Sequence, residues 1–200
     1  FLSSCRSEPS VSHPRILIHG EEGSQAKIVQ SFLGVAGTES LTNSVTEVYL
    51  DENASVDLYK LERESHQAFH MDSLQVWQDK ASRFDSHVYS FGAGLSRNDL
   101  CVVLDGEGAE CSLNGLYEAT GEQHVDHHTT IDHAKPKTTS RELYKGILDG
   151  NARGVFDGRV IVRPDAQKIS SSQTNRNLLL SDRALVRTKP ELQISADDVK

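Results

Sequence analysis

The chain has 200 residues, a net charge of −8 at pH 7, and only 36% hydrophobic and 6% aromatic residues. The negative charge and the scattered basic residues argue against a nucleic-acid-binding groove, and no run approaches the roughly 20 apolar residues that span a bilayer. The low apolar fraction is unusual for a compact α/β enzyme. It fits a single domain, residues 1–200, built as a solenoid of thin repeated layers.

The first quarter of the chain indicates short extended segments. Residues 1–4 could end a strand, residues 6–13 read as a polar loop, and residues 14–19 (PRILIH) predict a strand that closes at the turn 20–23. The apolar residues of the segment 26–33 fit helix and strand about equally, as is usual for short runs.

A repeat favours strand for this segment. Turns of Asp, Gly, Asn or Ser are followed by an alanine and then a β-type run, at Ala26, Ala54, Ala81, Ala109, Ala152, Ala166 and Ala184. The first three intervals are 28, 27 and 28 residues, and later ones are near half of that length. We interpret the period as one coil of a solenoid, with a small residue where the backbone bends over the coil below.

Further β-type runs follow in the middle of the chain. They lie at residues 45–50, 55–61, 87–91, 100–104 and 110–119. In the segments 57–61 and 87–91 we read the apolar residues as alternating, which predicts one buried face. Trp77 and Tyr144 are expected to pack against neighbours, and the glycine pairs at 92–94 and 106–108 are expected to form turns.

The last third, from Thr138 to Lys200, predicts a stack of short strands separated by Gly, Asp, Asn, Ser or Pro. Its runs are residues 143–148, 159–162, 178–180, 185–187 and 192–195. The polar segment 170–175 is expected to form a hydrogen-bonded ladder along a corner. Leu192, Ile194 and Ala196 are expected to face the interior, where a charge would be severely destabilising.

The richest titratable cluster is His124–His133. On a strand, His124, Asp126, His128 and Asp132 would point one way, and His127 and His133 would point the other way with Val125 and Ile131. Imidazole and carboxylate groups suit zinc, iron or nickel. A polar strand with hydrogen-bonded histidines explains the same residues.

Two enzymatic alternatives remain open at this point. Gly121, His124, Asp126 and His128 come near the pattern of a cupin-like jelly roll, although its Glu and trailing Gly are missing. Aspartates of turns could form the acidic cleft of a polysaccharide-lyase-like β-helix, although turn chemistry explains them as well; they are Asp157, Asp165, Asp197 and Asp198.

The three cysteines, Cys5, Cys101 and Cys111, lack metal-binding spacing. Reduced thiols in a reducing compartment are the simplest interpretation. A Cys101–Cys111 disulfide across a hairpin is the alternative for a secreted chain.

Four segments of the last third resemble one family. They are Tyr144-Lys145-Gly146, residues 153–158 (RGVFDG), residues 173–181 (QTNRNLLLS) and residues 189–200 (KPELQISADDVK). These segments resemble the β-helical core of the SufB/SufD family of the SUF iron–sulfur cluster assembly machinery. Weaker similarity reaches Pro14-Arg15-Ile16. The segment 189–200 resembles SufD and has no counterpart in SufB, so SufD is the better match.

The resemblance implies a right-handed parallel β-helix and a non-catalytic scaffold that pairs with a SufB-like protein and a SufC-like ATPase. The expected location is a bacterial cytoplasm or a plastid stroma. The family's N-terminal and C-terminal helical regions are expected to be absent from residues 1–200. In the family a Cys-Ser-His-Gly segment follows the stretch matching residues 196–200, so no catalytic, cofactor-binding or metal-binding residue is carried over here. The cluster would be handled by the full complex, and a homodimer of the isolated core stays open.

Overall fold

Two parallel sheets build the part of the chain that the computed structural model describes, residues 8–197, which contain no helix. The first sheet comprises β1 Ser10–Ser12, β2 Arg15–Gly20, β4 Ser40–Leu50, β6 Phe69–Gln78, β8 Leu95–Leu104, β10 His124–His133, β12 Arg153–Val162 and β14 Leu185–Ile194. The second comprises β3 Gln25–Leu33, β5 Ser55–Arg63, β7 Arg83–Ser90, β9 Glu110–Ala119, β11 Thr139–Leu148 and β13 Ser170–Leu179. These residues accordingly include no helix long and apolar enough to cross a membrane.

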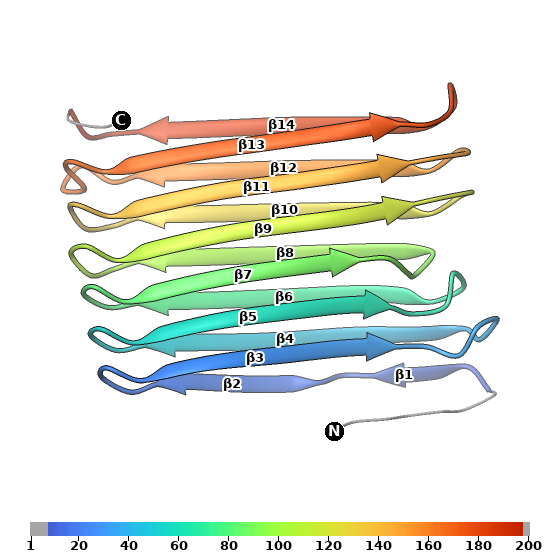
Figure 1. Cartoon of the computed structure of the whole chain (residues 1–200), viewed down its shortest axis with the longest axis horizontal. Coiled ribbons are helices and arrows are strands. Elements are labelled where there is room, and N and C mark those ends of the chain that lie inside the picture. The colour runs from blue at the N-terminus through green and yellow to red at the C-terminus, as the bar shows by residue number, and fades with distance from the viewer. Residues whose placement is uncertain (1–7, 198–200) are drawn as a thin grey trace.

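The strands coil into a parallel β-solenoid of about six turns, as the sequence predicts. From β3 on, each strand pairs in parallel with the strand two places later, so the chain alternates between the two sheets. Figure 1 shows the strands of one sheet running left to right in front, the strands of the other returning behind, and the chain climbing with each turn. This path makes the coil right-handed, as expected.

The core is the narrow space between the two sheets. Alternate residues of each inner strand are buried, because successive side chains of a strand point to opposite faces. The apolar members form one main cluster and a smaller one next to it; examples are Val48, Leu58, Leu74, Phe84, Leu104, Leu113, Ile131 and Val162 in the main cluster and Tyr117 and Leu148 in the smaller one. Tyr144 is buried, whereas Trp77 faces outward and stacks on Tyr49 with ring centroids 5.0 Å apart.

The turns repeat, and the predicted alanines mark some of them. Ala54, Ala109, Ala152 and Ala184 are buried, and each immediately precedes a strand, as the sequence predicts. Ser82 takes the equivalent place before β7, whereas Ala81 is exposed with φ of 52°, and Ala26 lies inside β3. What repeats is the geometry, because the residue two places before each strand from β3 to β13 in the second sheet has positive φ; these are Gly23, Asn53, Ala81, Gly108, Lys137 and Lys168.

The strands of the last third are longer than their apolar runs. The runs 185–187 and 192–195 fall on the single strand β14, which ends at Ile194. The runs 143–148 and 159–162 form the ends of β11 and β12, which begin several residues earlier. Pro190 divides the two runs of β14 and cannot donate a backbone hydrogen bond. A strand with a free edge tolerates it, and β14 pairs only with β12 among the described strands.

The polar segment 170–175 bonds to the coil before it, but within strand β13 rather than along a corner. The hydroxyls of Ser140 and Ser171 are 2.8 Å apart, and Gln173 Nε2 donates to Glu142 at 2.6 Å. The glycine pairs at 92–94 and 106–108 do lie in turns. At Gly106 a side chain would collide with the backbone of Lys80 in the preceding turn. The strand expected at residues 1–4 lies outside the described residues.

The expectation that Leu192 and Ile194 are buried is wrong. They stand in register with the buried Val160 and Val162, on the inward side of β14, yet they are 62% and 44% exposed. No described strand covers them, because β14 and β13 form the last coil of the described residues. Ala196 is partly buried against the core.

This difference gives a matched pair of substitutions in the 200-residue chain. Val160→Asp should lower the free energy of unfolding by roughly 3 kcal/mol or more, because it places an unpaired charge in the core. Leu192→Asp, one coil further on in the same column, should change it by less than about 1 kcal/mol, because the charge stays in water. Urea unfolding followed by circular dichroism measures both. Equal losses in the two variants would contradict the burial described here.

Candidate functional site

Strand β10 places the histidine cluster on both faces of the first sheet, in the orientation that the sequence predicts. His127 and His133 are buried together with Val125 and Ile131. His124, Asp126, His128 and Asp132 alternate with them and are partly exposed on the outer face. The cluster is therefore two separate sets of side chains, divided by the backbone of the sheet.

The outer carboxylates of β10 are already engaged by cations. Arg97 Nη1 donates to Asp126 at 2.9 Å, and His128 Nε2 lies 2.8 Å from the other oxygen of Asp126. Arg163 forms a two-pronged contact with Asp132 at 2.7 to 3.2 Å. A guanidinium that grips a carboxylate in this way satisfies the oxygens that a metal would need.

The inward histidines are held neutral. His127 packs between the rings of Tyr117 and Tyr144, with centroids 5.3 and 5.1 Å away, and burial lowers its pKa to about 4. The two nitrogens of His133 lie 2.7 and 2.9 Å from the hydroxyls of Thr138 and Ser140, and burial lowers its pKa to about 4 as well. These rings serve as packed, polar core residues.

The two enzymatic alternatives gain no support from the geometry. A cupin-like jelly roll is wrong, because cupins are antiparallel and the strands here are parallel. Within residues 8–197 no group of three or more His, Cys, Asp or Glu side chains is placed to hold a metal ion. Asp157 lies within strand β12 rather than a turn, Asp165 is in the loop before β13, and Asp197 follows β14. Asp198 lies outside the described residues.

The two described cysteines are free thiols. Cys101 lies on β8 of the first sheet and Cys111 is buried on β9 of the second, so the alternative of a disulfide between them is wrong. Burial raises the pKa of both thiols, most strongly that of Cys111. Neither is therefore a thiolate near neutral pH. Cys5 lies outside the described residues.

Sequence reasoning missed a cluster of charged side chains inside the first coils. Its residues lie on β5, in the turn after β5 and on the facing strand β6. They are Lys60, Glu62, Glu64, His70 and Asp72. All five are buried, with exposures of 0 to 7%. We call these five residues the interior charge cluster.

The members of the interior charge cluster pair with one another. Lys60 Nζ donates to Asp72, which also accepts from the hydroxyl of Ser44. The ring of His70 lies between two carboxylates, with Nδ1 2.7 Å from Glu64 and Nε2 3.5 Å from Glu62. Buried charges are tolerated when they are paired in this manner.

Hydroxyl groups from the neighbouring strands β4, β7 and β8 complete the cluster. Ser90 and Ser96 each donate to Glu62 at 2.8 Å, and Thr42 donates to Glu64 at 2.6 Å. Burial opposes ionisation of Glu62, but the charges of His70 and Lys60 outweigh it and hold its pKa below the usual value. Burial likewise opposes protonation of His70, but Glu62 and Glu64 raise its pKa. The two neighbouring carboxylates thus favour the protonated form of the His70 ring.

A signal for this cluster exists in the sequence. Lys60 and Glu62 continue the same face of β5 as the buried Val56 and Leu58, two residues apart each time. His70 and Asp72 do the same on β6 with Leu74 and Val76. Strict alternation from the apolar residues would have placed all four side chains inside.

The buried neutral histidines predict an acid-sensitive fold. The unfolded chain binds a proton at each near pH 6.5, and the native chain resists until about pH 4. Stability should therefore fall as the pH decreases through this window, by about 1.4 kcal/mol per pH unit for each histidine. His127→Gln should flatten the dependence of the unfolding free energy on pH. The neighbouring His128→Gln, on the outer face, is the control, and an equal flattening in both would contradict the assignment.

The interior charge cluster predicts a sharp contrast between buried and exposed ion pairs. Lys60→Met leaves Asp72 charged and buried, and should cost about 3 to 5 kcal/mol of unfolding free energy. The double variant Lys60→Met, Asp72→Leu should recover most of that loss. Lys137→Met, which removes the exposed pair with Glu107, should cost less than about 1 kcal/mol. Chemical denaturation of the three variants measures this, and a double variant no better than Lys60→Met alone would speak against the pairing.

Comparison with known proteins gives one consistent family. A family model described as "SUF system FeS cluster assembly, SufBD core domain" matches residues 1–200. An iron–sulfur cluster assembly SufBD family protein of Synechocystis sp. is 36% identical over 209 residues, covering 100% of this chain and 46% of that protein. Protein ABCI7, chloroplastic, of Arabidopsis thaliana is 36% identical, covering 95% of this chain and 40% of its own length.

The iron–sulfur cluster assembly protein SufD of Escherichia coli is 32% identical over 196 residues, covering 96% of this chain and 46% of that protein. The chain therefore spans less than half the length of these three relatives. The family model treats SufB and SufD together, and it covers the whole of the solenoid described above. The chain belongs to the SufBD core-domain family of the SUF iron–sulfur cluster assembly system.

Proposed function

We propose that this chain is the core of a SufD-type scaffold, a non-catalytic component of iron–sulfur cluster assembly. Its partners would be a SufB-like protein and a SufC-like ATPase, and the cluster would be built by the whole complex rather than held by these residues. The family match supports the system, and relatives named SufD in Escherichia coli and Bacillus subtilis support the subunit. Bacterial and chloroplastic relatives support a bacterial cytoplasm or a plastid stroma as its location.

The observation that carries the proposal is the match of the SufBD core-domain model to residues 1–200, which include the whole of the described solenoid. The right-handed parallel coil of the two sheets is the fold that the family resemblance implies, so sequence and structure support the same assignment.

Co-purification tests the proposal with the full-length protein. Tagged wild type should retain its SufB-like and SufC-like partners, as a scaffold of the assembly complex would. The same preparation without the tag is the control for nonspecific capture.

Failure of wild type to retain either partner, with a homodimer found instead, would reject the SufD-type assignment itself.

A further inference from the structure

A shallow depression lies on the outer face of the first sheet, at the end where its strands β10, β12 and β14 begin. Its volume is about 240 Å³, and it is lined by His124, Arg153, Gly154, Val155, Leu185 and Arg187. His124, Arg153 and Leu185 stand in register on the three strands, and Arg187 is next to Val155. Three cationic or basic side chains thus come from three successive coils and surround one space.

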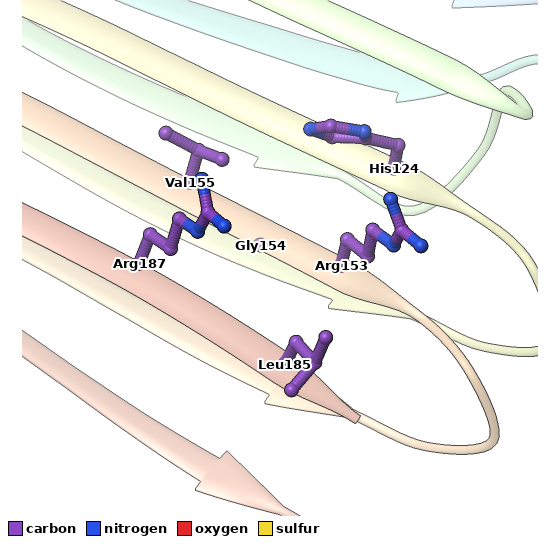
Figure 2. Close-up of a pocket in the computed structure, with 6 residues that line it drawn as sticks. All are labelled: His124, Arg153, Gly154, Val155, Leu185 and Arg187. Atoms are coloured by element: carbon purple, nitrogen blue, oxygen red, sulfur yellow. The ribbon is translucent and has the colours of Figure 1, made fainter. Parts of the chain in front are cut away.

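The two arginines reach into the depression from different strands. Figure 2 shows the Arg153 side chain extending from β12 toward His124 on β10, and the Arg187 side chain extending from β14 toward Val155. In the same view Gly154 lies between the two side chains, Val155 lies beside the end of Arg187, and Leu185 lies below Arg153. The result is an apolar floor with guanidinium groups at its rim, the arrangement by which a protein holds a small charged group away from bulk water.

These arginines lack the carboxylate partners that their neighbours have. On the same side of the solenoid, Arg97 pairs with Asp99 and Asp126, Arg159 with Glu191, and Arg163 with Asp132. Within residues 8–197, neither Arg153 nor Arg187 has an ion pair or a side-chain hydrogen bond.

The nearest carboxylates on these strands are committed elsewhere. Asp126 is held by Arg97 and His128, and Asp157 lies 4.0 Å from Lys189. The two arginines lack carboxylate partners although carboxylates outnumber basic side chains in the chain, with 29 Asp and Glu residues against 21 Lys and Arg.

The positions of Arg153 and Arg187 on neighbouring strands do not stabilise the sheet. Arg187 is the diagonal cross-strand neighbour of Arg153, since it lies two residues beyond Leu185, the register partner of Arg153. Like charges directly opposite each other destabilise a sheet, and at the wider diagonal spacing two arginines still gain no attraction from each other. An anion between the two guanidinium groups would remove that repulsion and form charge-assisted hydrogen bonds.

We propose that His124, Arg153 and Arg187 form a binding site for a small oxyanion, a phosphate or carboxylate group. The volume sets the size of the group, because sites for drug-sized ligands take about 300 to 1,000 Å³, and this depression is smaller. The planar guanidinium donors match the oxygens of either group. The site does not depend on the proposed scaffold role, because all of its side chains come from this chain.

Calorimetric titration of the full-length protein tests the site, with inorganic phosphate and acetate as probes at constant ionic strength. Wild type should bind phosphate, acetate or both, with dissociation constants on the order of millimolar. Binding of phosphate alone identifies a phosphate site, and binding of acetate alone identifies a carboxylate site. Arg153→Gln with Arg187→Gln should weaken binding at least about tenfold, which corresponds to the loss of charge-assisted hydrogen bonds.

The control variant carries Arg141→Gln with Arg176→Gln. These are two exposed arginines of β11 and β13 without ion pairs, so the net charge changes by the same amount on the other sheet. Its affinity should stay within about twofold of wild type. Absence of binding by wild type would overturn the proposal, and so would equal weakening in the two double variants, because the anions would then respond only to net charge.

Discussion

Parallel stacking in register is the constraint on which the whole molecule depends. Each coil lies directly on the one before it, with residues paired one to one between successive strands of a sheet. Inward side chains therefore line up in columns, in which each side chain contacts its register partners in the coils on either side. An apolar residue is covered only if the next coil supplies another side chain of suitable size. A polar residue is tolerated only if the coils on either side supply its hydrogen-bond partners. Burial in this fold is therefore a property of columns rather than of single strands.

The interior charge cluster illustrates this rule. Glu62 is satisfied by hydroxyls of Ser90 on β7 and Ser96 on β8, the strands of the next coil, while Lys60 reaches Asp72 on β6 of the opposite sheet. No local stretch of sequence contains all of these partners. The cluster ties both sheets and consecutive coils together, and buried networks of this kind carry a large penalty when one member is lost.

The sequence predicted a solenoid from its repeat of about 28 residues, and a right-handed parallel β-helix from the family resemblance. It predicted the orientation of the side chains of β10 from the two-residue period of a strand. It failed where the outcome depends on what lies one coil away. Leu192 and Ile194 have the pattern of core residues but no described coil above them. Lys60, Glu62, His70 and Asp72 have the composition of surface residues but lie on inward columns. For these four charged residues, residue type indicates the outer face. The two-residue alternation indicates the inner face, which is where they lie.

The alanine repeat marks only some of the turns, for a related reason. In the second sheet, the residue two places before each strand has a positive φ, and Gly, Asn, Ala and Lys all fill that place. The repeat is one of backbone geometry, which several residue types can satisfy, so a single residue type marks it incompletely. The family resemblance was informative because it used whole segments.

The same reasoning separates the surfaces of the solenoid. Inside, charges are matched across coils, and the two neutral histidines of β10 are packed against tyrosines or held by hydroxyls. Outside, Arg97, Arg159 and Arg163 are matched with carboxylates in register or close to it. Arg153 and Arg187 have no carboxylate partner among the described residues, although both border one depression. Two unmatched guanidinium groups around one space favour a bound anion over a role in stability.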